Sequence, residues 1–424
     1  MTATDTHRAI DAVWRIEAPR LIAGLARIVR DVGLAEELAQ DALVTALNEW
    51  PNAGIPDNPG AWLMAAAKNR AIDALRRKKM LARKHAEIAR EIEEEPATHQ
   101  EELEAALDDE IGDDMLRLIF TACHPVLSVE ARVALTLRLL GGLTTDEIAR
   151  AFLVPEPTIA QRIVRAKRAL ADAEVPYEVP RGEELSERLA SVLGVIYLIF
   201  NEGYAATAGD DWLRPGLCED ALRLVRILTE LAPLEPEVHG LAALLEIQAS
   251  RFAARTNASG EPVLLLDQDR ARWNGLLIRR GLDALARAAR LGGTRGAYVL
   301  QAEIAACHAR AVAAADTDWQ RIADIYAELA AVAPSPIVEL NRAVAIAMAH
   351  GPAAGLEVVD TLGDEPALKG YHLLPSVRGD LLAKLGRPTE ARAEFERAAS
   401  LTRNERERNL LLSRAAVCTD PPAA

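Results

Sequence analysis

Helix-forming residues occupy almost the whole chain, and no stretch alternates β-branched and polar residues as a half-buried strand does. Alanine, leucine, arginine and glutamate recur throughout its 424 residues, whereas aromatic residues make up only 4%. The four frequent residues all have high helix propensity, and a strand would require a repeat of two residues. We therefore predict an all-α protein. Because the length exceeds that of one ordinary domain, two or more helical domains are expected.

The sequence gives no sign of a membrane-spanning segment, a disulfide framework or a metal site. No apolar run approaches the roughly 18 residues that span a bilayer. The first 17 residues, MTATDTHRAIDAVWRIE, lack the basic-then-apolar order of a signal peptide. The four cysteines have no C-x-x-C spacing, which indicates reduced thiols, and Cys123-His124 is interpreted as a packed helix end. We expect a cytoplasmic protein without cofactor or metal.

Charge is distributed in blocks of opposite sign. The formal net charge is −14, yet residues 61–90 hold nine lysines and arginines against Asp73 and Glu87. Residues 91–114, EIEEEPATHQEELEAALDDEIGDD, then hold twelve acidic residues and no lysine or arginine. This composition is typical of a solvated linker, so a domain boundary is expected near residues 95–112. Two interpretations stay open: a flexible tether, or an intramolecular mimic of nucleic acid that covers the basic segment.

The basic segment AWLMAAAKNRAIDALRRKK, residues 61–79, is predicted to form one amphipathic helix. At about 100° per residue, one arc presents an aromatic ring, an amide and guanidinium groups, and the opposite arc is apolar. An amide can read a base edge, a ring can stack on a base and arginines neutralise phosphates, so this arc suits nucleic acid with exposed bases. The alternative is a solvated face with the ring in the core. The polar arc contains Trp62, Asn69, Asp73, Arg76 and Arg77, and the apolar arc contains Leu63, Met64, Ala67, Ala71 and Leu75.

A second basic helix is predicted in LTTDEIARAFLVPEPTIAQRIVRAKRAL, residues 143–170. Thr144 or Thr145 can cap a short helix, and Val154-Pro155 makes a turn before a new helix begins at Glu156. This is the spacing of a helix-turn-helix. An exposed arc of threonine, glutamine and arginine suits the major groove, because glutamine pairs with adenine and arginine with guanine. That arc contains Thr158, Gln161, Arg162 and Arg165, opposite a stripe of Ile159, Ile163, Ala166 and Leu170.

Three segments, in this order, resemble an extracytoplasmic-function sigma factor (group IV, sigma-70 class) of bacterial RNA polymerase. They are LAEELAQDALVTALNEW (34–50), the basic helix 61–79 and ARVALTLRLLGGLTTDEIARAFLVPEPTIAQRIVRAKRAL (131–170), and the resemblance covers roughly residues 10–172. It implies a first domain that binds the polymerase clamp and opens the −10 promoter element, and a second domain that reads the −35 element. Core RNA polymerase and promoter DNA are the implied partners. Ala160, Leu153 and Pro155 depart from the residues usual in the family.

The resemblance also implies roles for individual residues. Gln40 and Asp41 fall in the clamp-binding helix. Asn69 falls where the family captures a flipped −10 base. The −10 set is Trp62, Lys68, Asn69, Arg70, Asp73, Arg76 and Arg77, and the −35 set is Thr158, Gln161, Arg162 and Arg165.

A long C-terminal extension follows the proline-rich linker EVPYEVPRGEEL, which begins at residue 174. Tyr326, Asp360 and Phe395 recur at spacings of 34 and 35 residues. The last unit, VRGDLLAKLGRPTEARAEFERAASL, is similar to a tetratricopeptide repeat. Stacked helix pairs of this kind make a concave surface, so we expect a regulatory protein to bind there.

The segment YLIFNEGYAAT, residues 197–207, contains Tyr197, Asn201, Glu202 and Tyr204. General acid–base chemistry would need a second carboxylate, which this segment itself lacks, so we do not predict an enzyme. The other interpretations are a helix end at Gly203 and a contact onto the sigma domains or the polymerase. The segment also resembles a signature of the sigma-factor subgroup with a tetratricopeptide-like extension.

We therefore predict a sigma factor regulated in cis by its extension. The alternative is a helix-turn-helix regulator that binds duplex operators without core polymerase. The expected domains are a clamp and −10 domain (1–92), an acidic linker (93–112), a −35 domain (113–173), a second linker (174–184) and a helical extension (185–424), with repeats at about 296–415.

Overall fold

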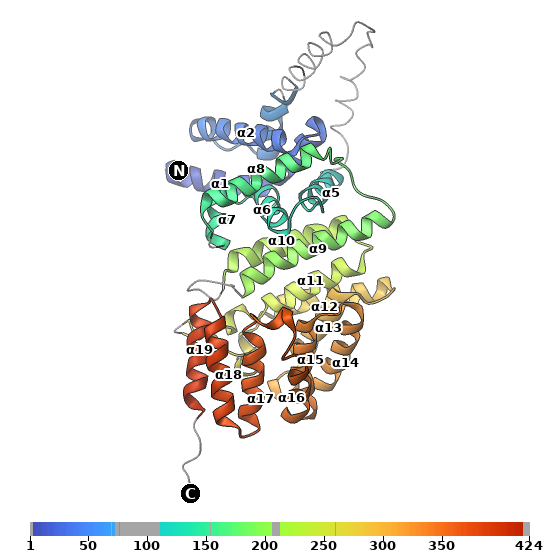
Figure 1. Cartoon of the computed structure of the whole chain (residues 1–424). Helices are drawn as coiled ribbons and strands as arrows, with labels where there is room; N and C mark the ends of the chain where they lie inside the picture. Colours follow the sequence, from blue (N-terminus) through green and yellow to red (C-terminus); the bar gives the residue numbers. More distant parts are fainter. Residues whose placement is uncertain are drawn as a thin grey trace. The chain divides into compact units, whose positions relative to one another are not determined.

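A computed structural model describes residues 3–68, 70–72, 76, 111–152, 154–205, 213–258 and 260–418. In these residues the regular structure is helical, apart from isolated bridge positions such as the pair Thr256 and Pro262, so the all-α prediction is confirmed. None of the described helices has the length and apolarity needed to cross a membrane. The chain forms two compact units, Met1–Leu198 and Ile199–Ala424 (Figure 1).

The first unit begins with two long helices that pack against each other, α1 (Ala3–Val29) and α2 (Val32–Ala53). The Asp31 carboxylate caps α2 by accepting a hydrogen bond from the Leu34 N–H at 3.1 Å. Residues 59–68, 70–72 and 76 are helical. The remaining helices of this unit are α5 (Ile111–Ala122), α6 (Val129–Leu139), α7 (Thr145–Phe152), α8 (Glu156–Asp172) and the first part of α9 (Glu183–Tyr204).

The predicted helix-turn-helix is formed by α7 and α8. Thr144, one of the two predicted caps, accepts a hydrogen bond from the Glu147 N–H, and the Glu147 carboxylate accepts one from the Thr144 N–H, which together make a capping box. Pro155 precedes α8 as predicted. The predicted stripe of Ile159, Ile163, Ala166 and Leu170 is buried.

The second unit is a succession of packed helices. Prolines occupy the first turn of many of them, where the missing N–H costs nothing. Short 3₁₀ helices lie between α11 and α12. The helices are α10 (Pro215–Leu231), α11 (Pro236–Ala249), α12 (Gly275–Leu291), α13 (Ala297–Arg310), α14 (Trp319–Val332), α15 (Pro336–His350), α16 (Pro352–Thr361), α17 (Leu373–Lys384), α18 (Pro388–Leu401) and α19 (Glu405–Val417).

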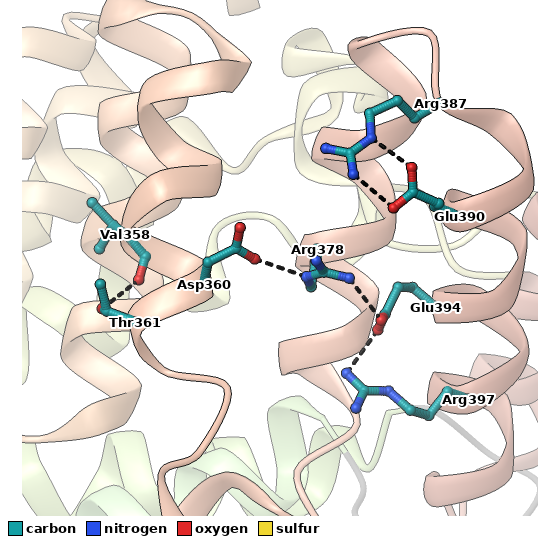
Figure 2. Close-up of polar contacts among 8 residues, drawn as sticks. All are labelled: Val358, Asp360, Thr361, Arg378, Arg387, Glu390, Glu394 and Arg397. Atoms are coloured by element: carbon teal, nitrogen blue, oxygen red, sulfur yellow. Dashed lines mark hydrogen bonds and ion pairs between the residues drawn. The ribbon is translucent and has the colours of Figure 1, made fainter.

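The repeat spacing corresponds to three packed helix pairs, α13 with α14, α15 with α16, and α17 with α18. In the last pair, a Cβ atom on Gly379 would lie 3.1 Å from two ring atoms of Phe395, so the glycine allows the close approach that the repeat pattern requires. Asp360 occupies the position of this Phe395 in the preceding pair. Its carboxylate accepts a hydrogen bond from Arg378 at 2.9 Å, and Arg378 also donates to Glu394 at 3.0 Å (Figure 2). An ion-pair network thus joins α16, α17 and α18 where an aromatic ring would otherwise pack.

Candidate nucleic-acid interface

The four residues of the candidate −35 arc lie on one face of α8, opposite its buried stripe. Gln161 and Arg165 are exposed, while Thr158 and Arg162 are half-buried. The α7 helix packs against α8 and holds this face outward. A glutamine amide and two guanidinium groups on one exposed helical face can form bidentate hydrogen bonds with base edges in a major groove.

Four residues of the candidate −10 set are described, while Asn69, Asp73 and Arg77 lie outside the described residues. Trp62 is half-buried and packs edge to face on Trp50, with ring centroids 5.3 Å apart, so part of this ring belongs to the core. Lys68 is half-buried. Arg70 and Arg76 are exposed.

Arg70 connects the basic helix with the candidate clamp residues on α2. Its guanidinium lies 3.5 Å from the Asp41 carboxylate and donates a hydrogen bond to the Thr45 hydroxyl at 3.3 Å. Asp41 is exposed. Gln40 is half-buried and donates a hydrogen bond to the Glu36 carboxylate at 2.6 Å. The side of α2 that carries Asp41 and Thr45 therefore faces the basic helix, and Gln40 is hydrogen-bonded one turn back along α2 to Glu36.

Glu36 is a buried carboxylate on α2 that holds two cations from the helix-turn-helix part of the chain. Its side chain is 4% exposed, with Arg138 Nε of α6 at 2.6 Å and Lys167 Nζ of α8 at 2.5 Å. A buried charge is tolerated only when it is well paired, and here two cations share one carboxylate. The sequence analysis did not identify this residue.

A second buried carboxylate, Asp114 on α5, joins the same two parts. Arg27 of α1 lies 2.9 Å from it and Arg117 lies 2.7 Å from it. Burial raises the pKa of Asp114, and the two arginines oppose this shift. Tyr177 completes the contact, because its hydroxyl lies 3.0 Å from the carbonyl oxygen of Ala23 and 3.0 Å from that of Asp114.

Residues after the helix-turn-helix also belong to the packing of the first unit. Arg188 of α9 donates a hydrogen bond to the Phe120 carbonyl at 2.9 Å, and Ser191 donates to the Cys123 carbonyl at 2.7 Å. Burial raises the pKa of the Cys123 thiol to about 11, as expected of a packed cysteine. The predicted linker 174–184 stays a prediction, while the first compact unit extends to Leu198.

Three of the four candidate contact residues near the end of α9, Asn201, Glu202 and Tyr204, belong to the second unit, whereas Tyr197 belongs to the first. Glu202 pairs with Arg214 at 2.5 Å, and the Tyr204 ring stacks on Phe200 and lies under the Arg255 guanidinium. Tyr197 and Asn201 are half-buried.

The helix α9 ends at Tyr204, one residue after the expected end at Gly203, but Gly203 lies inside the last turn and has no left-handed backbone, so it does not cap the helix. A Cβ atom there would lie 2.7 Å from Cys218 Sγ, so its absence lets α9 approach α10.

The described residues contain no group of three or more histidine, cysteine, aspartate or glutamate side chains arranged to hold a metal ion.

Comparison with known proteins places the candidate arcs in two families. A model described as Sigma-70 region 2 matches residues 14–80, one described as Sigma-70, region 4 matches residues 117–170, and a family of unknown function (DUF6596) matches residues 188–289. An uncharacterized protein of Rhizobium meliloti (strain 1021) is 43% identical over 399 residues, which cover 94% of this chain and 93% of that protein. A solved tetratricopeptide repeat protein from Parabacteroides merdae is similar at a TM-score of 0.35 and 14% identity, over 68% of this chain and 93% of that one.

Proposed function

Because the chain belongs to the extracytoplasmic-function sigma factors, we propose that it binds core RNA polymerase through α2 and the basic helix, and directs initiation at promoters whose −10 and −35 elements it reads. The observation that carries the proposal is the arc of exposed Gln161 and Arg165 and half-buried Arg162 on the second helix of a helix-turn-helix. The exposed Asp41 and Arg70, which pair with each other, support a binding surface at the first domain.

Run-off transcription with purified core polymerase, on upstream regions of the host genome, tests the proposal. Gln161→Ala or Arg162→Ala should weaken selectivity for the −35 element by about 1–3 kcal/mol, or roughly 5- to 150-fold. Arg168→Ala is the matched control, because Arg168 lies on the same helix, is 81% exposed at its side chain and, within the described part of the chain, pairs with the exposed Asp172. Equal losses in all three variants would contradict base reading by the arc.

For the −10 element we propose that Asn69 captures a flipped base. Asn69→Ala should leave closed-complex binding intact and reduce permanganate-detected melting of the promoter. Unchanged melting would contradict this role.

The alternative function is an operator-binding regulator, which would bind its DNA site specifically without core polymerase. The formal net charge of −14 repels free DNA, so we expect poor binding of promoter duplex by the isolated chain at physiological salt. Core polymerase should then confer tight binding. Tight sequence-specific binding of the chain alone in a mobility-shift assay would favour the operator-binding regulator.

We also propose that the second unit regulates the sigma domains in cis, with activation as the expected sign, and that a regulatory protein binds its helical repeats. A protease site inserted into residues 206–212 cuts the chain between α9 and α10. Tyr177, Arg188 and Ser191 then stay with the N-terminal fragment, together with residues 199–205 of the second unit. Transcription by the intact and the cleaved chain is compared with the same core polymerase. Equal activity would remove the regulatory role of the second unit.

A further inference from the structure

The helix that we assign to polymerase binding is also the helix that holds the −35 domain. Glu36 and Gln40 lie one turn apart on α2, and the Gln40 amide donates to the same Glu36 oxygen that lies 2.6 Å from Arg138. The second Glu36 oxygen lies 2.5 Å from Lys167. A candidate clamp residue is thus hydrogen-bonded to the carboxylate that anchors α6 and α8.

With α8 packed on α2, the two DNA-reading domains lie too close together to contact both promoter elements at once. The −10 and −35 elements lie about 25 base pairs apart, or about 85 Å along B-DNA at 3.4 Å per pair. The whole of α8, with 17 residues, is about 26 Å long, and it contacts α2 directly. A chain that occupies both elements must therefore separate the two domains and break the Glu36 contacts.

We propose that the Glu36 surface of α2 is a shared docking surface, occupied by Arg138 and Lys167 of the −35 domain in the free chain and taken over by core polymerase on assembly. We name the Glu36, Arg138 and Lys167 contact the Glu36 latch. The inference rests on the proposed sigma-factor function. The partner that takes the place of the −35 domain should present basic side chains of its own, because covering the Glu36 carboxylate again requires cations in place of Arg138 and Lys167.

The interface around the latch has the character of a reversible contact. Both cations keep 22% of their side-chain surface in solvent, so each can be rehydrated when the domains part. A cleft of about 1280 Å³ lies beside the latch, and it is lined by Arg27, Arg30 and Gly33 from the first domain and by Arg117 and Lys167 from the second. Charged, incompletely filled interfaces are typical of contacts that open, whereas permanent ones are apolar and close-packed.

The latch does not act alone. The Arg27 and Asp114 pair and the Tyr177 hydroxyl bridge α1 and α5, so they open together with it. Tyr177 lies in the segment that leads to the second unit, which connects the latch to the part of the chain that we assign to regulation.

A disulfide across the latch tests the proposal directly. An ideal Cβ atom on Gly33 would lie 3.9 Å from Lys167 Cβ, within the range of about 3.5–4.5 Å that a disulfide requires. Gly33→Cys with Lys167→Cys should therefore form a disulfide in the free full-length chain. The oxidised double variant should bind core polymerase and support run-off transcription at least tenfold less well than the reduced one, and dithiothreitol should restore both.

Both single variants, Gly33→Cys and Lys167→Cys, control for the four native thiols and for the lost lysine. Failure of the disulfide to form in the folded free chain would overturn the latch. Equal core binding by the oxidised and the reduced double variant would overturn it as well, while the sigma-factor function stands. Absence of core binding by the unmodified chain would overturn the proposed function, and the shared surface with it.

An opening variant gives the opposite readout without a crosslink. Arg138→Gln with Lys167→Gln removes both cations and leaves α2 and the arc of Gln161, Arg162 and Arg165 unchanged. If nine in ten free chains are closed, the apparent dissociation constant for core polymerase should fall about tenfold. Arg168→Gln, on the same helix, should leave it unchanged. A dissociation constant equal to that of the unmodified chain, with normal thermal unfolding, would show that the −35 domain does not compete for α2.

Discussion

Gly203 and Gly194 lie on the same helix, α9, and the structure predicts opposite effects when each is replaced by alanine. A Cβ atom on Gly203 would lie 2.7 Å from Cys218 Sγ, 2.8 Å from the Cys218 nitrogen and 2.9 Å from the Arg214 carbonyl oxygen. Two of these three atoms belong to the backbone of the segment that begins α10, so they cannot rotate away as a side chain can. The start of α10 must shift, and the Arg214 N–H to Gly203 carbonyl hydrogen bond of 2.8 Å shifts with it.

The magnitude follows from two opposing terms. Overpacking of a filled contact costs about 1–3 kcal/mol, toward the upper end where backbone must move. Alanine recovers about 0.5–1 kcal/mol of helix propensity over glycine. Gly203→Ala should therefore destabilise the second unit by about 2 kcal/mol net. Gly194 has no atom within 4 Å of its ideal Cβ position, so Gly194→Ala should gain only the propensity term.

Thermal unfolding of the full chain by calorimetry measures both effects. For a unit of this size, about 2 kcal/mol corresponds to a Tm that is about 4–8 °C lower. Gly203→Ala should lower the transition of the second unit by that amount, and Gly194→Ala should lower neither transition. If the Tm values of the Gly203→Ala and Gly194→Ala variants were equal, α9 and α10 would not approach as closely as described, and Gly203 would have another role.

Three further changes test other parts of the structure. Burial, with the Arg251 and Arg270 charges, lowers the pKa of His308 from 6.5 to about 4. The unfolded imidazole then binds a proton that the folded one does not, so stability should fall by up to about 3 kcal/mol between pH 6.5 and 4, and His308→Gln should flatten the Tm-against-pH curve. Arg378→Gln should lower the free energy of unfolding in urea by only about 1 kcal/mol. The loss is small because Glu394 keeps its pair with Arg397 at 2.7 Å and the Asp360 side chain is half exposed. Arg387→Gln, at an exposed ion pair, should cause no change. Tyr177→Phe should cost the first unit about 1–2 kcal/mol in the same assay, because the hydroxyl is lost between two carbonyl groups.

Local patterns in the sequence were sufficient to predict the helix-turn-helix. The burial of Ile159 and Ile163 follows from their helical spacing, and the start of α8 follows from Pro155, because both depend on residues close in the chain. The repeat units were predictable for the same reason, since Gly379 and Phe395 lie in one unit and pack on each other.

The Glu36 latch could not be predicted in this way. Glu36 and Glu37 are adjacent and chemically identical, yet Glu36 is buried and Glu37 is exposed. The difference comes from Arg138, which is 102 residues away in sequence and reaches Glu36 only in the folded chain. Asp360 is a similar case, because its place in the repeat suggests packing, whereas its partner Arg378 on the next helix makes it an ion-pair residue.

The latch also bears on the contrast between an acidic chain and its basic helices. Lys167 lies on α8, the helix that carries the −35 arc, and Arg138 lies on α6, which packs against it. While both cations are held by Glu36, neither can neutralise a phosphate, so the closed chain approaches DNA with two fewer positive groups beside its recognition helix. Opening on core polymerase frees them at the moment when α8 must dock. If so, the affinity of the core-bound unmodified chain for −35 DNA should fall more steeply with salt than the affinity of the core-bound Arg138→Gln, Lys167→Gln variant. Each phosphate contact contributes about 0.9 to the slope of log K against log salt, and the variant lacks the two freed cations.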